Sequence, residues 1–193
     1  MPRPAVFLDR DGVLNWERGY LSQLRDLELM PTSAEAVKKL NTAGIFCCLV
    51  SNQAGAARGY YDLDHIAAVT EQLQKLLWTS AQAHLDAIYY CTRLSPPAGG
   101  KRPDLATWSS WRKPNPGMLV AAAWQYDLDL KHSFMVGDKA TDIDLAHNAG
   151  CQGILLTSGY GAAVIAGTYQ HPTDPAYVAP DLKSAVDWIL TQI

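Results

Sequence analysis

Two carboxylates, Asp9 and Asp11, follow directly on the apolar run Ala5–Leu8. The run is typical of a buried strand in a parallel sheet, and open α/β sheets bind ligands at the carboxyl ends of their strands. The alternate spacing places both carboxylates around one turn, where their combined charge favours a divalent cation. Mg²⁺ suits this site, since it prefers oxygen ligands and often shares them with a substrate phosphate. A calcium-binding loop, the rival, needs more oxygen ligands and a later glycine than Gly12.

Other polar residues stand at the ends of two further apolar runs and in the irregular stretch between them. They are Ser51 and Asn52 after residues 45–50, Asp138 and Lys139 after residues 133–136, and Lys113 shortly before a predicted helix. A carboxylate can attack phosphorus when a metal and a lysine offset the repulsion between two anions. Hydroxyl, amide and backbone N–H groups can hold the phosphoryl oxygens. These residue types therefore predict phosphoryl transfer, and neither glycine-rich nucleotide-binding motif follows the first strand.

Apolar strands and amphipathic helices alternate along the chain. We expect strands at 5–8, 45–50, 87–90, 133–136 and 153–156, and helices at 32–44, 62–84, 116–126, 141–149 and 181–190. Thr32 and Glu35 match a capping box, and Pro116 suits the first turn of its helix. The alternation predicts an α/β fold with a doubly wound, Rossmann-like parallel sheet of about five strands.

Between these elements, residues 54–61 and 157–168 are predicted to form loops, and residues 91–115 an insertion that is long for an inert loop. We expect the insertion to act as a minimal cap or lid. No interdomain linker interrupts the pattern, so residues 1–193 are predicted to form a single domain.

Composition limits the partners of the chain. Its 193 residues, 48% of them hydrophobic, can bury the core of one domain, and a net charge of −3 disfavours nucleic acid as a partner. No apolar stretch approaches the roughly 20 residues of a membrane span, and no signal peptide precedes the first strand. We therefore expect a cytoplasmic monomer with a small-molecule partner and no membrane partner. Cys47 and Cys48 lie in an apolar run and are expected to be free, buried thiols.

Four motifs, in order, resemble those of the haloacid dehalogenase superfamily of phosphatases. They are DRDGVLN from Asp9, SNQ from Ser51, RKP from Arg112 and GDKATD from Gly137. Within the superfamily, Gly19-Tyr20, the stretch SNQAGAARG and the stretch RKPNPGM are similar to the heptose bisphosphate phosphatases of lipopolysaccharide-precursor synthesis. The resemblance extends from residue 5 to the region of residue 160. It implies a Mg²⁺-dependent phosphatase for a phosphorylated sugar, best matched by the 7-phosphate of heptose 1,7-bisphosphate.

The resemblance also implies a role for each matching residue. Asp9 would be the nucleophile that forms an aspartyl-phosphate, and Asp11 would first protonate the leaving oxygen and then activate water. Ser51 and Asn52 would hold the transferring phosphoryl group, and Lys113 would steady the charge of the nucleophile and the phosphate. Mg²⁺ would be held by Asp9, the backbone carbonyl of Asp11 and Asp138. Substrate contacts are implied for Glu17, Arg18, Gly19, Tyr20, Asn52, Gln53, Ala54, Arg112 and Lys139.

Three further residues deserve separate expectations. Arg112 is suited to a second, non-reacting phosphate, because its planar fork pairs with two phosphate oxygens at once. Asp142 is expected either to brace the loop after the fourth strand or to touch the metal. For Arg58 the sequence leaves two roles open, a contact with the ligand and a structural contact.

One departure concerns the insertion, where the resembling family carries a structural zinc in a Cys-x-His and a Cys-x-Cys pair. The corresponding positions here are Cys91, Arg93, Ser109 and Trp111. One thiol cannot make a tetrahedral site, so no structural zinc is expected. Trp108 and Trp111 are expected to pack the insertion instead, and Trp78 and Trp124 to pack on helix faces or in the core.

Other functions remain open from the sequence. A related histidinol-phosphate phosphatase shares the motifs, and a non-catalytic module could bind sugar phosphates without turnover. A polynucleotide 3′-phosphatase shares the chemistry but needs a basic surface, which the net charge does not indicate.

Overall fold

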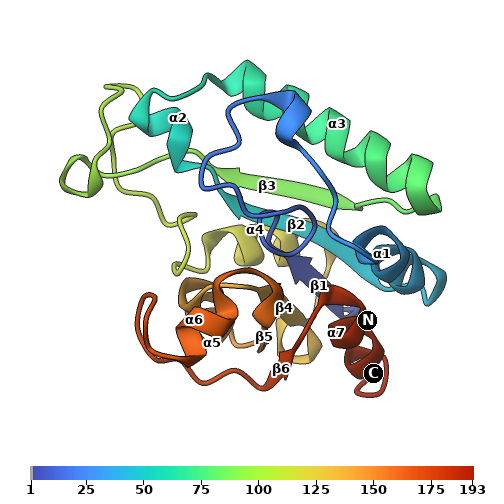
Figure 1. Cartoon of the computed structure of the whole chain (residues 1–193). Helices are drawn as coiled ribbons and strands as arrows, with labels where there is room; N and C mark the ends of the chain where they lie inside the picture. Colours follow the sequence, from blue (N-terminus) through green and yellow to red (C-terminus); the bar gives the residue numbers. More distant parts are fainter. Residues whose placement is uncertain (1) are drawn as a thin grey trace.

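Six parallel strands form one sheet at the centre of the computed structural model, which describes residues 2–193 (Figure 1). They are β1 (Ala5–Leu8), β2 (Phe46–Asn52), β3 (Ala87–Cys91), β4 (Phe134–Gly137), β5 (Gln152–Leu156) and β6 (Tyr177–Ala179). Their order in the sheet is β3-β2-β1-β4-β5-β6. The predicted doubly wound parallel sheet is confirmed. It has one strand more than the sequence indicated, the three-residue edge strand β6.

Helices cover both faces of the sheet. The first face carries α1 (Ser33–Thr42), α3 (Leu63–Ala81) and α7 (Leu182–Ile189), and the second carries α4 (Gly117–Tyr126) and α5 (Ala140–Ala149). Alternation along β1 explains the two cores, because Val6 and Leu8 pack into the first and Ala5 and Phe7 into the second. All four side chains are fully buried, so β1 is held by apolar packing from both sides.

The point where the strand order reverses lies between β1 and β4, which pair from Val6–Phe134 to Leu8–Val136. Asp9 follows β1, and its N–H donates to the carbonyl of Val136 at 3.0 Å, so the ladder continues one residue beyond the strand. Asp138 follows β4 directly. Two carboxylates therefore flank the switch point at which sheets of this topology bind ligands.

The insertion docks on α2 (Ala54–Arg58), a short helix in the stretch predicted as a loop. The carbonyl of Ala57 accepts bonds from the backbone N–H groups of Lys101 (2.8 Å) and Arg102 (3.0 Å). Arg58 Nη2 donates to the carbonyl of Ala98 at 2.9 Å. Apolar residues from the insertion, α2 and α3 form a small separate core, made of Leu94, Leu105, Ala56, Ala57 and Ile66. Backbone hydrogen bonds and this core thus order the insertion, and Arg58 has a structural contact.

Short helical turns complete the chain: Leu24–Asp26, Pro96–Ala98, Leu130–His132, Thr157–Gly161 and α6 (Ala162–Ile165). The last two replace much of the loop predicted at 157–168. No helix between residues 2 and 193 combines the length and the apolarity that a bilayer span requires. Cys47, Cys48, Cys91 and Cys151 are free and buried, as expected for the first two.

Several local predictions were wrong. Thr32 has a left-handed backbone (φ 63°) and makes no side-chain cap, since a capping side chain needs an extended residue. Pro116 is the residue before α4 and does not lie in its first turn. Trp78, Trp108 and Trp124 are 57%, 69% and 89% exposed, so none of them packs in the core or pins the insertion.

Candidate active site

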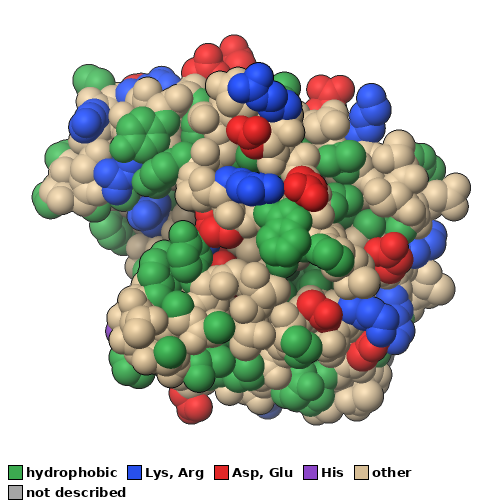
Figure 2. Space-filling model, viewed as in Figure 1, with side chains coloured by type: hydrophobic (Ala, Val, Ile, Leu, Met, Phe, Trp, Pro, Cys, Tyr) green, Lys and Arg blue, Asp and Glu red, His purple; other side chains and the backbone are tan. Residues whose placement is uncertain are grey.

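A pocket of about 360 Å³ opens at the carboxyl edge of the sheet. Figure 2 shows this face hollowed, with acidic side chains recessed in the hollow and Lys and Arg side chains gathered on the side of α2. The predicted site residues that line it are Asp9, Asp11, Glu17, Gly19, Tyr20, Ser51, Asn52, Gln53, Ala54, Arg112, Lys113 and Lys139. Segments from four regions of the sequence therefore converge on one cavity.

Asp9 lies at the base of the pocket and is 5% exposed. Its Oδ1 accepts a hydrogen bond from the Arg10 backbone N–H at 2.7 Å and lies 2.9 Å from Lys113 Nζ. Burial alone would raise the pKa of this carboxyl, but the ammonium groups of Lys113 and Lys139 bring it below its ordinary value. Asp9 is therefore held as an ionised carboxylate, the form that a nucleophile requires.

Lys113 comes from the insertion and is fully enclosed. Its Nζ lies 2.6 Å from Asp142 Oδ1 and donates to the carbonyl of Val50 at 3.2 Å. Asn52 fixes the backbone of Lys113, because its side-chain amide exchanges bonds of 3.1 and 3.2 Å with the Lys113 N–H and carbonyl. Burial lowers the pKa of Lys113, but Asp142 and Asp9 raise it above its ordinary value, so the ammonium stays charged.

Asp138 is fully buried, and burial raises its pKa to about 7. Its Oδ2 accepts from the Tyr160 backbone N–H at 2.9 Å. Its Oδ1 accepts no hydrogen bond from any residue in 2–193, although Lys139 Nζ lies 3.2 Å away. A Cβ at Gly12 or Gly159 would stand 2.2 or 2.1 Å from Asp138 Oδ2, so two glycines make the space for this carboxylate.

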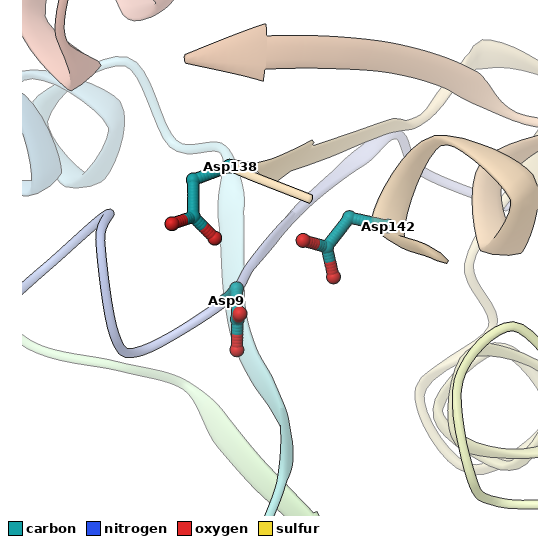
Figure 3. A group of neighbouring side chains, drawn as sticks. All are labelled: Asp9, Asp138 and Asp142. Carbon is teal, nitrogen blue, oxygen red and sulfur yellow. The ribbon is translucent and has the colours of Figure 1, made fainter. Parts of the chain in front are cut away.

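Asp142 joins Asp9 and Asp138 in a group whose carboxylate oxygens lie within 4.8 Å of one another, and Figure 3 shows the three side chains around one space. It also braces the start of α5, because its Oδ2 accepts from the Lys139 backbone N–H at 3.1 Å. The predicted bracing role is thus confirmed. The Asp11 carboxylate lies apart from this group, although spacing suggested that it would join Asp9.

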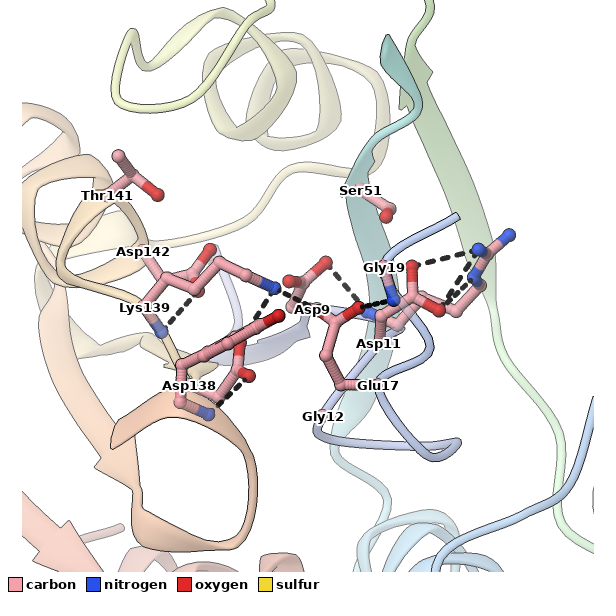
Figure 4. Close-up of polar contacts among 12 residues, drawn as sticks. Asp9, Asp11, Gly12, Glu17, Gly19, Ser51, Asp138, Lys139, Thr141 and Asp142 are labelled. Atoms are coloured by element: carbon pink, nitrogen blue, oxygen red, sulfur yellow. Dashed lines mark hydrogen bonds and ion pairs between the residues drawn. The ribbon is translucent and has the colours of Figure 1, made fainter. Parts of the chain in front are cut away.

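Figure 4 shows the polar contacts around the pocket, including those of the first loop with Asp11 and Glu17. The Asp11 carboxylate accepts from Arg10 at 2.8 Å and from Asn15 at 2.8 Å. Glu17 receives the Gly19 N–H at 2.6 Å and, through its second oxygen, the Lys139 ammonium at 2.6 Å. Glu17 and Lys139 therefore link the first loop to the β4–α5 turn across the pocket.

Arg18 differs from expectation, and Ser51 has a partner within the protein. Arg18 does not line the pocket, since its guanidinium pairs with Glu28 at 3.2 Å and the side chain is 51% exposed. Ser51 lines the pocket, but its hydroxyl oxygen already accepts a bond from Gln53 at 3.0 Å. The hydroxyl proton is left to donate to a ligand.

Arg112 enters the pocket from the insertion and has an unused donor. Its buried Nη1 has no hydrogen-bond partner within residues 2–193. Burial and the nearby Arg58 guanidinium lower its pKa. A cation in the pocket wall that forms no ion pair with any described residue favours an anionic ligand.

Several lining residues carried no signal in the motifs. They are Arg10, Tyr61, Thr141, Tyr160, Tyr169 and Gln170. Tyr160 and Tyr169 stack with ring centroids 4.2 Å apart, and Lys139 Nζ lies 5.1 Å from the Tyr160 centroid. Of these residues Arg10 and Thr141 stand inside quoted motifs. Arg10 could have been noticed there, between the two carboxylates.

The four positions that correspond to zinc ligands in the resembling family gather in the structure. Cys91, Arg93, Ser109 and Trp111 line a small cavity of about 180 Å³. Cys91 contributes the one thiol, and its Sγ lies 3.7 Å from the Arg93 carbonyl. These four positions therefore lie around one cavity but do not supply four metal-ligating side chains.

Comparison with known proteins agrees with this site. A family model described as "HAD-hyrolase-like" matches residues 110–185, the segment that carries Arg112, Lys113, Asp138 and Asp142. The fold and the strand-end cluster thus define a hydrolase of the haloacid dehalogenase class.

Relatives narrow the class to one family. The chain is 62% identical over 193 residues to D-glycero-D-manno-heptose-1,7-bisphosphate 7-phosphatase of Thermosynechococcus vestitus, covering 100% of this chain and 98% of the relative. It is 35% identical over 188 residues to the D-glycero-beta-D-manno-heptose-1,7-bisphosphate 7-phosphatase of Helicobacter pylori strain J99, covering 96% of each. The chain belongs to the heptose-1,7-bisphosphate 7-phosphatase family.

A solved structure is similar over nearly the whole chain. The D,D-heptose 1,7-bisphosphate phosphatase from B. bronchiseptica, complexed with magnesium and phosphate, superposes with a TM-score of 0.82 at 30% identity. The match covers 98% of this chain and 99% of that one.

Proposed function

We propose that this chain is a Mg²⁺-dependent phosphatase that removes the 7-phosphate of heptose 1,7-bisphosphate through an aspartyl-phosphate on Asp9. The observation that carries the proposal is the ionised, buried Asp9 at 2.9 Å from Lys113, in the pocket that also holds the free donor of Arg112. The names of the relatives at 62% and 35% identity support the substrate.

The residues of the pocket divide the work of phosphoryl transfer. Asp9 attacks the phosphorus, and the leaving sugar oxygen takes a proton from Asp11 as the bond breaks. Lys113 offsets the charge that the phosphoryl group brings next to Asp9, while the Ser51 hydroxyl donates to a phosphoryl oxygen. Asp11 then takes a proton from the water that attacks the aspartyl-phosphate, which restores Asp9 and releases phosphate.

The side chains at the switch point fit a magnesium ion. The three carboxylates of Asp9, Asp138 and Asp142 face two ammonium groups, and Asp138 Oδ1 accepts no hydrogen bond within residues 2–193. Asp9, Asp138 and the backbone carbonyl of Asp11 would hold the ion, as oxygen ligands suited to Mg²⁺. Bound there, it would neutralise charge on the transferring phosphoryl group. We propose no structural zinc, since Cys91 supplies one thiol.

Arg112 is proposed to bind the phosphate that does not react. Its replacement by methionine should raise KM for a sugar bisphosphate by about 10- to 100-fold, because a charge-assisted bond to phosphate contributes roughly 1.5–3 kcal/mol. The KM for a monophosphate of the same sugar should change little. Equal losses on both substrates would contradict this role.

Substrate turnover tests the function as a whole. We expect purified protein to release phosphate from heptose 1,7-bisphosphate in Mg²⁺ and to stop in chelator, with Asp9→Asn inactive. Activity that survives chelation or Asp9→Asn contradicts the mechanism. Faster turnover of histidinol phosphate than of the heptose bisphosphate would indicate a histidinol-phosphate phosphatase. Thermal stabilisation by sugar phosphates without phosphate release would indicate a non-catalytic binding module.

A further inference from the structure

Arg10 is the largest fully buried side chain among residues 2–193, at 2% exposure. A guanidinium keeps its charge at any ordinary pH, so burying it is costly unless a carboxylate compensates. Among residues 2–193 the single ion pair of Arg10 is with Asp11. A buried positive charge therefore lies next to the proposed acid, Asp11, and none of the roles implied for the four motifs explains Arg10.

The contact is bidentate and leaves Asp11 little freedom. Arg10 Nε lies 3.2 Å from Asp11 Oδ1, and Nη2 lies 3.0 Å from Oδ1 and 2.8 Å from Oδ2. Asn15 adds a fourth bond, from Nδ2 to Oδ1 at 2.8 Å, and is itself held by the Trp16 carbonyl at 2.9 Å. Fork-like pairing of this kind fixes the plane of a carboxylate as well as its position.

The backbone of Arg10 ties the same unit to the nucleophile. Its N–H donates to Asp9 Oδ1 at 2.7 Å, and its carbonyl accepts from the Leu14 and Asn15 N–H groups at 2.9 and 3.1 Å. One residue thus contacts Asp9 through its backbone and Asp11 through its side chain. Any movement of Arg10 shifts the two carboxylates relative to each other.

We propose that Arg10 is a positioning residue, which holds the Asp11 carboxylate in the orientation from which it reaches the leaving oxygen of the substrate. The proposal rests on the proposed function, in which Asp11 is the acid. Proton transfer needs the acid within hydrogen-bond reach, and a misplacement of 1 Å can cost about 100-fold in rate. Both residues line the pocket, but the Asp11 side chain is 18% exposed and that of Arg10 only 2%, and the guanidinium is bonded to Asp11, so in this proposal Arg10 acts through Asp11.

Leaving groups of different basicity separate this role from general damage. A sugar alkoxide must be protonated as it leaves, whereas 4-nitrophenolate leaves as a stable anion, so only the first substrate needs the acid. We expect Arg10→Met to lower kcat/KM for the sugar phosphate by about 100-fold and to change that for 4-nitrophenyl phosphate little. kcat/KM is the proper measure because it reports the steps from free enzyme and substrate up to the departure of the leaving group. Later hydrolysis of the aspartyl-phosphate does not enter it.

A double-mutant cycle tests whether the effect of Arg10 on turnover passes through Asp11. Asp11→Asn should show the same substrate pattern, and Arg10→Met should cause no further loss in the Asp11→Asn background. Arg10→Lys, which keeps the charge without the fork, should give an intermediate loss with the same pattern. It also serves if the methionine variant does not fold. Arg102→Met is the matched control, because the Arg102 guanidinium also pairs with both carboxylate oxygens of an aspartate, Asp104, but on the surface, through two bonds of 3.1 and 2.6 Å.

The outcomes are distinguishable. If Asp11→Asn slows both substrates equally, the proposed role of Asp11 is wrong and the failure lies in the proposed function. If Asp11→Asn discriminates between the substrates but Arg10→Met and Arg10→Lys do not, the positioning role of Arg10 is overturned. A further loss from Arg10→Met in the Asp11→Asn background also overturns it, and indicates direct contact with the substrate.

Discussion

Replacing Lys113 by methionine removes the ammonium group that contacts both Asp9 and Asp142 and keeps a side chain of similar length. Lys113 is 4% exposed, and its Nζ lies 2.9 Å from one carboxylate and 2.6 Å from the other. Breaking a buried ion pair by removing one partner costs about 3–5 kcal/mol, because the remaining charge stays buried. Protonation of Asp142, whose pKa burial already raises, limits the loss. We expect the free energy of unfolding to fall by about 3 kcal/mol at pH 7.

Urea unfolding in chelator, followed by circular dichroism, measures this loss. The control is Lys183→Met, the same chemical change at an exposed pair in which Nζ lies 3.0 Å from Asp187. Exposed pairs contribute little, so the control should keep its unfolding midpoint. The loss in Lys113→Met should shrink toward pH 5, where protonation removes the unpaired charge. A midpoint for Lys113→Met equal to that of the control at pH 7 would refute the electrostatic account of the pocket.

Two further predictions concern Asp138. Gly12→Ala should abolish turnover, because the new Cβ would stand 2.2 Å from Asp138 Oδ2. The control is Gly44→Ala, where the backbone is also left-handed (φ 73°) but a Cβ would have no atom within 4 Å. This variant should lose about 1–2 kcal/mol of stability and keep its kcat. Equal kcat values for the two variants would contradict this reading. Because the pKa of Asp138 is raised to about 7, protons compete with Mg²⁺ below that pH, and affinity measured by calorimetry should weaken by about tenfold per pH unit from 7 downward. Affinity falls as the pH falls because the ionised carboxylate is the form that binds Mg²⁺. A Mg²⁺ affinity that does not change between pH 6 and pH 8 would contradict this prediction.

Much of this site could be predicted because its parts are local in sequence. Asp9 and Asp138 each follow an apolar run directly, and parallel strands bring their carboxyl ends to one edge. The fold class could be predicted for the same reason, because the hydrophobic pattern of each long helix and strand is visible within its own stretch of sequence. The edge strand β6, with three residues, and the five-residue helix α2 were too short to show a period.

The parts that could not be predicted depend on contacts distant in sequence. Arg10 looks like a surface charge until the fold encloses it with Asp11 as its partner. Thr32 and Glu35 match a capping box, but Thr32 makes no side-chain cap, and the next residue, Ser33, donates its hydroxyl to the Leu14 carbonyl at 3.0 Å, nineteen positions away. Arg18 matches the family position, yet its partner Glu28 lies in a neighbouring loop. In each case a tertiary partner decides the conformation.

The central claim is that the Asp9 carboxylate accepts the phosphoryl group. Rapid acid quench during turnover of heptose 1,7-bisphosphate in Mg²⁺, followed by proteolysis and mass spectrometry, tests it directly. We expect a phosphorylated peptide whose modified residue is Asp9, absent without substrate and absent in Asp9→Asn. Steady turnover with no phosphate on Asp9, or with phosphate on another residue, would contradict the account.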